Sequence, residues 1–269
     1  MAAMLPVARV VDDLTRLGIE NGDVVMAHAS MRSLGPVEGG AGGLIEALDL
    51  AVGTAGSILM VLGARDDWAW VNERPESERV ALLAHAVPFD ALRTPADPEV
   101  GTLAEVFRCH PGTVVNDHPE GRFGARGRLA ADLVSNPPRD DYYGPRSPLE
   151  RFVDVGGRVL RLGADPDTVT LLHHAEYLAA VANKRRVRRH RLIAGPEGPE
   201  VEVIDCLDDE HGIVDHPGED YFATILRAYL ATGRADTGMV GAATGELIDA
   251  RDLVEFAVDW MGEHLGHAP

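Results

Sequence analysis

The chain has 269 residues, 45% of them hydrophobic, which is enough to bury the core of a globular protein. Its 43 acidic residues outnumber its 25 lysines and arginines and give a net charge of −18, so a polyanionic partner such as DNA or RNA is disfavoured. The acidic surface favours a cationic small molecule, although acidity can equally serve solubility alone.

Cysteine usage and the N-terminal sequence predict a cytoplasmic protein. Cys109 and Cys206 stand far apart, in neither a CxxC spacing nor a disulfide framework, which suits a reducing compartment. Residues 1–13 lack the apolar core of a signal peptide, and no apolar run approaches the length of about 18 residues that a membrane span needs. We therefore expect no membrane partner.

The first predicted elements form a β-α-β unit. Apolar residues at helical spacing predict an amphipathic helix over 7–17, which Gly18 ends. Short apolar runs at 24–29 and 57–62 predict two strands, and the residues at 44–52 have the periodicity of a helix between them.

The second half of the chain continues the alternation. Strands are predicted at 158–162 and 201–204, and two helices with apolar stripes are predicted over 222–230 and 253–261. Strands and helices that alternate throughout are typical of a layered α/β fold. Because no linker or internal repeat divides the sequence, we predict a single domain over residues 1–269.

Residues 64–98 stand apart from this pattern as a long irregular insertion, with a short helix predicted near 80–86. Long loops of this kind are either functional or disordered. Trp68 and Trp70 within it suit a binding role and plain packing equally well.

The loop after the first strand has the composition of an anion site. Residues 29–35 supply two hydroxyls and an arginine, and the glycine-rich segment 38–43 leads into a helix. Backbone N–H groups and a helix N-terminus together hold phosphate oxygens. The segment lacks the Gly-Lys-Ser/Thr ending of an ATP site, and Ile45 replaces the third glycine of a dinucleotide site. A flexible turn with an N-terminal cap is the alternative.

A second chemical feature lies in the predicted helix over 167–179. Four apolar residues predict a stripe that packs inward: Leu171, Ala175, Leu178 and Ala182. His173 and Glu176 fall on the opposite face, close enough at this spacing for the imidazole to contact the carboxylate. A histidine oriented by a carboxylate is a general base. An exposed ion pair on the helix surface is the other interpretation.

The same helix offers a possible metal site, since His-x-x-Glu is a ligand spacing. A zinc site needs three or four ligands. The remaining candidate histidines occupy separate segments without the His-Glu-x-x-His spacing: His28, His85, His110 and His118. We therefore predict an activity that requires no metal.

Seven segments, taken in order, resemble the aminoglycoside 3-N-acetyltransferase family of antibiotic-resistance enzymes. They are residues 24–43, 118–127, 147–148, 156–160, 170–176, 183–187 and 238–241. The resemblance implies a three-layer α/β/α sandwich with a mixed sheet, which is not the GNAT fold. It also implies acetyl-CoA as cosubstrate and the 3-amino group of a 2-deoxystreptamine aminoglycoside as acceptor.

The resemblance implies roles for single residues. His173 matches the general base and Glu176 its orienting carboxylate, while Thr170, one turn earlier, is a candidate donor to the oxyanion. The matches to coenzyme A contacts are Ser30, Met31, Arg32, Ser33, Gly35, Val37, His118, Phe123 and Ser147. An aminoglycoside carries several ammonium groups, so we expect carboxylates in its pocket. The candidates are Asp66, Asp67, Glu73, Asp208, Asp209 and Glu210.

The implied reaction is direct acetyl transfer without an acyl-enzyme, with an aminoglycoside and coenzyme A as partners. Two alternatives stay open. One is an acetyltransferase for another natural-product amine, and the other is a catalytically silent relative that binds coenzyme A. Whether the chain forms a homodimer is also left open.

Overall fold

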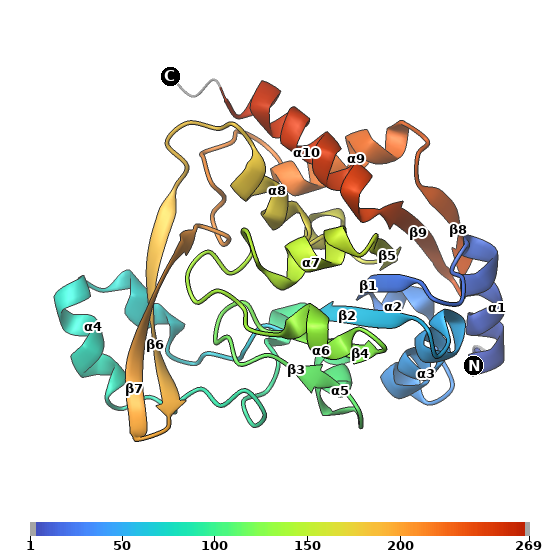
Figure 1. Cartoon of the computed structure of the whole chain (residues 1–269). Helices are drawn as coiled ribbons and strands as arrows, with labels where there is room; N and C mark the ends of the chain where they lie inside the picture. Colours follow the sequence, from blue (N-terminus) through green and yellow to red (C-terminus); the bar gives the residue numbers. More distant parts are fainter. Residues whose placement is uncertain (1–3, 267–269) are drawn as a thin grey trace.

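A seven-stranded sheet forms the middle layer of the computed structural model, which describes residues 4–266 (Figure 1). Its strand order is β3-β4-β2-β1-β5-β9-β8. Strand β1 pairs in parallel with β2 and β5, and the remaining pairs are antiparallel. The strands are β1 (Val24–Ala29), β2 (Ser57–Val61), β3 (Val114–Val115), β4 (Phe123–Gly127), β5 (Arg158–Leu162), β8 (Asp236–Val240) and β9 (Ala243–Asp249).

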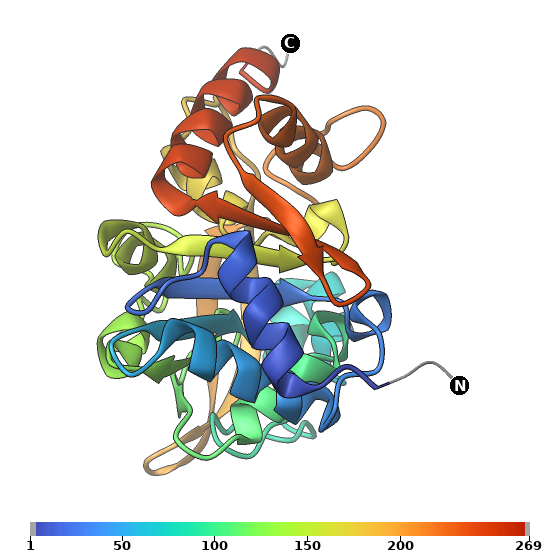
Figure 2. The same cartoon turned by 90° about the vertical axis from the view of Figure 1, so that its right-hand side faces the viewer.

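Helices cover both faces of the sheet and make the other two layers. One face carries α1 (Val7–Leu17), α2 (Met31–Leu34), α3 (Gly40–Val52) and α5 (Thr102–Cys109). The other carries α6 (Ala130–Val134), α7 (Pro148–Asp154), α8 (Leu172–Leu178), α9 (Tyr221–Ala231) and α10 (Ala250–His264). Figure 2 shows α9 and α10 together at the top of the view, away from α1 and α3.

Alternation along β1 explains why the sheet is buried on both sides. Val25 and Ala27 pack into the core with α1 and α3, whereas Val24 and Met26 pack into the core on the opposite face. Side chains of a strand point to opposite faces in turn, so both faces of β1 need apolar residues. The prediction of an α/β/α sandwich with a mixed sheet is confirmed.

The predicted β-α-β unit is present as β1, α3 and β2, with β1 and β2 in parallel. The N-terminal helix ends where expected, because Gly18 adopts a left-handed φ of 112° and its N–H caps the carbonyls of the last turn. The described residues contain no helix long and apolar enough to cross a membrane.

A two-stranded ribbon lies outside the main sheet. It consists of β6 (Arg186–Gly195) and β7 (Gly198–Leu207), paired along their whole length. Within the ribbon the sequence predicted only residues 201–204 as strand. It missed β6 because the many arginines of β6 hide the alternation of apolar and polar residues. Ile204, Cys206 and Leu207 anchor the base of the ribbon in the core.

The insertion at 64–98 wraps against this ribbon (Figure 1). It contains the 3-10 helix η1 (Ala69–Glu73) and α4 (Glu76–Leu83), and it runs into η2 (Pro98–Val100). The helix predicted near 80–86 therefore begins earlier, directly after Pro75. Phe89 joins the edge of β6, since its N–H donates to the carbonyl of Leu192 at 2.8 Å and its carbonyl accepts from Ala194 at 2.9 Å.

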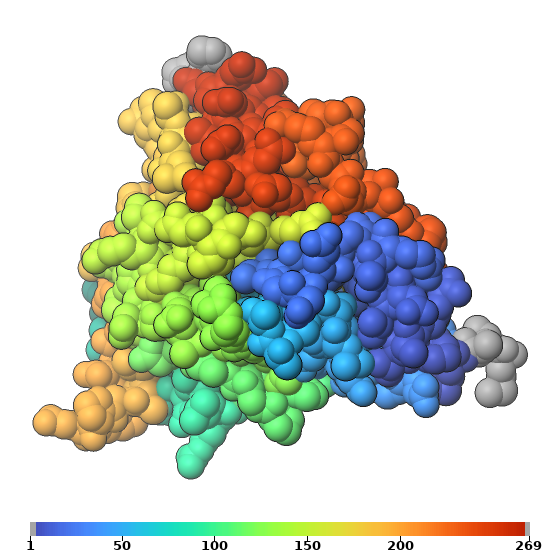
Figure 3. Space-filling model, turned by 45° about the vertical axis from the view of Figure 1, so that its right-hand side comes forward, coloured from blue at the N-terminus to red at the C-terminus, as the bar shows by residue number. Residues whose placement is uncertain are grey.

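Arg122 fastens the end of the insertion to the sheet. Its side chain is fully buried, and its guanidinium donates to the carbonyls of Gly63, Ala91, Thr94 and Pro95 at 2.6 to 3.2 Å. In Figure 3 the ribbon and insertion project at the lower left, while the C-terminal helices in red and orange cover the top.

The predicted inward stripe of the helix over 167–179 is wrong in its second half. Leu171 and Ala175 are buried, but Leu178 is 47% exposed and Ala182 lies on the surface beyond the end of α8. The helix is shorter than expected, because residues 166–168 form the separate 3-10 helix η3 (Pro166–Thr168) and Ala179 is extended. Helical spacing places residues on one face only while the helix continues, and Ala182 lies beyond its end.

Candidate active site

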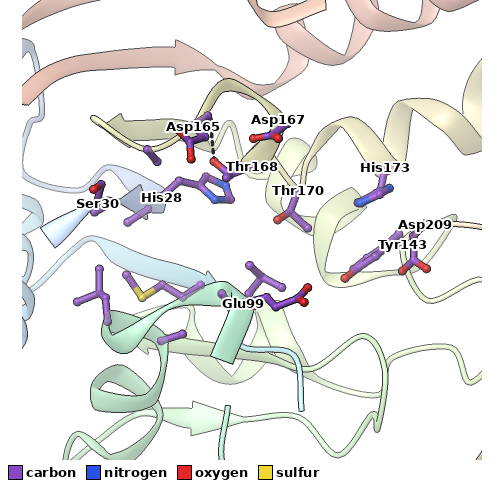
Figure 4. Close-up of a pocket in the computed structure, with 18 residues that line it drawn as sticks. His28, Ser30, Glu99, Tyr143, Asp165, Asp167, Thr168, Thr170, His173 and Asp209 are labelled. Carbon is purple, nitrogen blue, oxygen red and sulfur yellow. Dashed lines mark hydrogen bonds between the residues drawn. The ribbon is translucent and has the colours of Figure 1, made fainter. Parts of the chain in front are cut away.

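Two cavities meet at His173. The first, of about 520 Å³, lies beyond the carboxyl ends of β1, β2 and β5, where open α/β sheets bind ligands. Figure 4 shows His28, Ser30, Thr170 and His173 among its lining residues. The second cavity, of about 220 Å³, is bounded by α8 and the start of α9. Both cavities are lined by Asp167, His173 and Asp209.

His173 and Glu176 form a hydrogen-bonded pair on α8. The ring Nδ1 lies 2.7 Å from Oε2 of Glu176, whose side chain is only 1% exposed. The other carboxylate oxygen, Oε1, accepts from the hydroxyl of Tyr221 at the start of α9. Glu176 is therefore held from two sides, and Nε2 of His173 is the ring nitrogen left free at the junction of the cavities.

Two aromatic rings fix the plane of the imidazole. Tyr143 stacks on His173 with ring centroids 5.0 Å apart and an angle of 10° between the planes. Phe222 meets the ring edge-on at 4.7 Å and 65°. The position of His173 is thus determined by packing as well as by Glu176.

Opposing effects act on the pKa of His173. Burial disfavours the protonated ring, but the carboxylate of Glu176 attracts it and accepts its hydrogen bond, with smaller contributions from Asp209 and Asp220. The attraction prevails and the pKa is raised above 6.5. The site therefore stabilises the imidazolium that a general base forms when it takes a proton.

The second cavity is acidic. No lysine or arginine is among the described residues that line it, whereas six carboxylates are. These are Asp167, Glu176, Asp209, Glu210, Glu219 and Asp220. Such a lining attracts a cationic ligand to the free side of His173.

Comparison with known proteins decides the family. Residues 26–262 match the family model described as aminoglycoside 3-N-acetyltransferase. The chain belongs to this family. It is an N-acetyltransferase.

Relatives of this acetyltransferase match it over nearly their whole length. Aminoglycoside N(3)-acetyltransferase VII of Streptomyces paromomycinus is 39% identical, with 96% of this chain and 92% of the relative covered. A solved structure of AAC-IIIb in a binary complex with CoASH has a TM-score of 0.93, 35% identity and coverage of 99% and 100%. Sisomicin-bound AAC-VIa has a TM-score of 0.89, 35% identity and coverage of 97% and 99%.

The loop predicted to contact coenzyme A lies at the edge of the first cavity of the acetyltransferase. Ser30 lines the cavity and caps α2, since its Oγ accepts from the N–H of Ser33 at 3.3 Å. Met31, Arg32 and Ser33 form the short helix α2, and Arg32 is exposed on it. Of the predicted loop residues only Ser30 is among those that line the cavity; the others lie outside it: Met31, Arg32, Ser33, Gly35 and Val37.

Three other predicted coenzyme contacts are buried and have partners within the protein. Nδ1 of His118 accepts from the N–H groups of Glu120 and Gly121, and its Nε2 lies 2.8 Å from the carbonyl of Arg139. Burial lowers the pKa of His118 to about 4. Phe123 packs edge-on against Tyr143, and Ser147 caps α7. The fold places none of the three among the residues that line the first cavity.

The predicted substrate carboxylates divide between the cavities and the surface. Asp209 lines both cavities that meet at His173, and Glu210 lines the second. Asp209 also accepts from the Tyr142 hydroxyl at 2.6 Å and pairs with Arg189 at 2.5 Å. Part of its charge is therefore already balanced.

The remaining predicted carboxylates lie near the ribbon. Glu73 and Asp208 line a third cavity, of about 600 Å³, between the insertion and the ribbon. Asp208 is 3% exposed and accepts from the N–H groups of Glu210 and His211. Asp66 pairs with Arg191 at 2.9 Å, and Asp67 pairs with Arg65 on the surface at 2.9 Å.

Several site residues were missed by sequence reasoning. Glu219 and Asp220 precede a helix, where an acidic residue indicates an N-cap, and Asp220 does cap α9. Tyr143 and Tyr221 had no pattern to mark them, because segments distant in sequence bring them to α8.

His174, the neighbour of the proposed base, is buried, and its Nδ1 lies 2.9 Å from the carbonyl of Tyr143. In residues 4–266 no group of three or more histidine, cysteine or acidic side chains is arranged to hold a metal ion.

Proposed function

We propose that this acetyltransferase moves the acetyl group of acetyl-CoA to the 3-amino group of a 2-deoxystreptamine aminoglycoside, by direct transfer with His173 as general base. The transfer would confer resistance to the antibiotic. The observation that supports the proposal most directly is the position of His173 where the two cavities meet. A carboxylate-oriented histidine stands where a cavity at the strand ends meets a cavity lined by carboxylates.

The acidic cavity suits the aminoglycoside. Several ammonium groups on one ligand need several acceptors, and Asp209, Glu219 and Asp220 provide them around His173. The sisomicin-bound AAC-VIa structure supports an aminoglycoside as the ligand of this fold. The acceptor amine would lie against Nε2 of His173.

Acetyl-CoA is the cosubstrate, and the first cavity suits its uncharged arm. No lysine or arginine is among the described residues of that cavity, so the phosphates would remain outside it. There the exposed Arg32 and the N-terminus of α3, preceded by Gly39, provide donors for anionic oxygens. The arm would pass Ser30 and deliver the thioester to His173.

The chemical step needs a single histidine. Nε2 of His173 takes a proton from the acceptor amine as the nitrogen attacks the thioester carbon. The carbon–sulfur bond breaks, and the coenzyme A thiolate receives the proton from His173. Thr170 lines the same cavity and would donate to the oxyanion, a contribution of about 3 kcal/mol for such donors. Because the amine attacks directly, no acyl-enzyme forms.

The test is acetyl transfer by the purified protein. Acetyl-CoA and gentamicin should release free thiol, and NMR of the product should place the acetyl group on the 3-amino group. No release across a panel of 2-deoxystreptamine aminoglycosides would contradict the proposal. Release only with another class of natural-product amine would favour a different acceptor.

The role of His173 is tested separately. His173→Ala should abolish most of the turnover and leave acetyl-CoA binding close to that of the unchanged protein. His174→Ala would be a poor control, because His174 supports the backbone at Tyr143. His110→Ala, at a partly exposed position that lines neither cavity, is the matched control. A normal rate in His173→Ala would refute the assignment of the base.

A further inference from the structure

His28 is a buried histidine that the mechanism above does not use. It lies near the end of β1, is 7% exposed and lines the first cavity (Figure 4). Its Nε2 is enclosed and has no hydrogen-bond partner among the described residues. Buried N–H groups in proteins nearly always have an acceptor, so an enclosed ring nitrogen without a partner is better suited to carry the lone pair than the hydrogen.

The unpaired nitrogen belongs to a row of polar side chains that crosses three strands. His28 on β1 is opposite Arg161 on β5, and Arg161 is opposite Glu246 on β9. Arg161 and Glu246 form an ion pair at 2.6 Å, with side chains 12% and 6% exposed. In residues 4–266, the buried side-chain atoms without a partner are Nε2 of His28, Nε of Arg161 and Oε2 of Glu246.

The charge of Arg161 acts on His28 and bears on which ring nitrogen carries the proton. A guanidinium has only donors, so an imidazole beside it presents a lone pair rather than a second N–H. Burial and the charge of Arg161 lower the pKa of His28 to about 4, so the ring is neutral at neutral pH. With the lone pair on the enclosed Nε2, the hydrogen of the neutral ring is on Nδ1.

We propose that His28 donates a hydrogen bond from Nδ1 to the pantetheine arm of acetyl-CoA, at the carbonyl oxygen of the amide nearest the thioester. Thr170 lies between His28 and His173 in the view of Figure 4, and all three line the first cavity. The thioester belongs beside Thr170 and His173, and His28 therefore meets the arm further along. This inference rests on the proposed use of acetyl-CoA.

The ion pair of Arg161 and Glu246 has a function in this arrangement. A buried pair stabilises a fold weakly, since desolvation offsets much of its attraction. Here the pair holds a charge beside His28 that keeps the imidazole neutral and in one tautomer. In the other neutral tautomer, Nδ1 would carry a lone pair and the donor would be lost.

Two substitutions at one position test the contact. His28→Phe keeps the aromatic area and removes the donor, whereas His28→Asn places an amide N–H near the position of Nδ1. We expect His28→Phe to raise the KM for acetyl-CoA and the Kd for CoASH by about 3- to 10-fold, the effect of one neutral hydrogen bond. The kcat at saturating acetyl-CoA and the KM for gentamicin should change by less than about 2-fold.

His28→Asn should recover most of the affinity for CoASH. The inference is overturned if CoASH affinity is the same in both variants and the unchanged protein. It is also overturned if kcat falls while CoASH affinity does not, since His28 would then act at the acyl carbonyl. Because the comparison is made in an enzyme that already turns over, failure of the proposed function would appear separately, as inactivity of the unchanged protein.

A measurement on the unchanged protein tests the contact even if the variants fail to fold. Nitrogen-15 NMR of histidine side chains distinguishes the two neutral tautomers. His28 should be in the Nδ1–H form at neutral pH, and its Nδ1 resonance should shift when CoASH is added. The opposite tautomer, or a resonance that CoASH leaves in place, would refute the contact.

Discussion

His173 shows how one imidazole is adapted by its immediate neighbours. Glu176 accepts from Nδ1, Tyr221 donates to Glu176, and Tyr143 and Phe222 confine the ring. Burial depresses the pKa of a histidine, and it is the largest cause for His28 and His118, whose pKa values are lowered to about 4. Of these three histidines, only His173 has a carboxylate in hydrogen-bond contact, and this carboxylate raises its pKa.

The pH dependence of the reaction should report this balance. The base must be neutral to accept a proton, so kcat/KM should rise with pH through the pKa of His173, which lies above 6.5. Glu176→Gln removes the attraction and leaves the burial, and the pKa should fall below 6.5. NMR titration of the imidazole in the free enzyme measures both values.

Glu150→Gln is the control for that titration, since Glu150 acts on His174 rather than on His173. An unchanged pKa of His173 in Glu176→Gln would show that the carboxylate does not set it. Because Glu176 also orients the ring, the rate at high pH should be lower in Glu176→Gln than in the unchanged protein.

Tyr221 should act as a positioning residue through Glu176. Tyr221→Phe removes a donor from a buried carboxylate, so Glu176 becomes a stronger acceptor and the pKa of His173 should rise further. We expect kcat to fall by about 10-fold and the free energy of unfolding to fall by about 2 kcal/mol. Activity assays, NMR titration and urea unfolding measure the three effects.

Tyr229→Phe is matched to this variant. The Tyr229 hydroxyl also donates to a carboxylate, Asp252, at 2.6 Å, but it lies away from the cavities. A purely structural role for Tyr221 predicts the same result in both variants: lower stability and an unmoved His173 pKa.

The sequence predicted the contact between His173 and Glu176 because both lie within one helix turn, where spacing fixes distance. Their roles as base and orienting carboxylate were implied by the family resemblance and stay predictions. It could not identify Tyr143, Tyr221 or His28 as neighbours of one site. Their proximity depends on how separate strands and helices pack, which no local pattern encodes.

Among the elements, the ribbon β6–β7 and the insertion behave as one unit. Asn72 accepts from the N–H of His190, Glu76 pairs with Arg188 at 2.5 Å, and Phe89 joins the edge of β6. The basic residues at 186–191 belong to β6, and two of its arginines pair with carboxylates of the insertion: Arg188 with Glu76 and Arg191 with Asp66. Apolar runs predicted the main-sheet strands β1, β2 and β5, whereas β6 is paired with β7 along its whole length and carries arginines that form ion pairs with the insertion.

Arg122 should be essential to the attachment of the insertion. No carboxylate pairs with it among the described residues, and four backbone carbonyls take its hydrogen bonds instead. Arg122→Leu leaves those buried carbonyls without donors, so the free energy of unfolding should fall by at least about 3 kcal/mol. Residues 84–96 should also become sensitive to proteolysis.

The exposed Arg128 provides the comparison, since it makes one hydrogen bond, to the carbonyl of Ala55. Arg128→Leu should change the stability by less than about 1 kcal/mol. Equal losses in the two variants, measured by urea unfolding, would contradict the role given to Arg122.

At the scale of the whole molecule, we propose that the chain folds as a single domain that includes the insertion. Ribbon residues Ile204, Cys206 and Leu207 belong to the main core, and Arg122 joins the insertion to β4. Thermal unfolding should therefore show one transition. Trp260→Phe leaves Trp68 and Trp70 as fluorescent probes of the insertion, while far-UV circular dichroism reports the rest.

Coincident transitions would support the single domain, whereas fluorescence that changes before the dichroism would show that the insertion unfolds on its own.

The structure also shows where part of the net charge of −18 lies. Part of the excess acidity lines the second cavity, so the composition indicated a cationic ligand without indicating where it binds.

The position of His173 at the junction of two cavities has a consequence for steady-state kinetics. If each substrate occupies its own cavity and the base touches both, neither product can leave before both substrates have bound. Double-reciprocal plots at several fixed acetyl-CoA concentrations should then intersect, and parallel lines would contradict direct transfer. The same geometry favours an inhibitor that joins coenzyme A sulfur to an aminoglycoside nitrogen through a short linker. Such a molecule would fill both cavities, and its linker would lie beside His173, where the acetyl group is transferred.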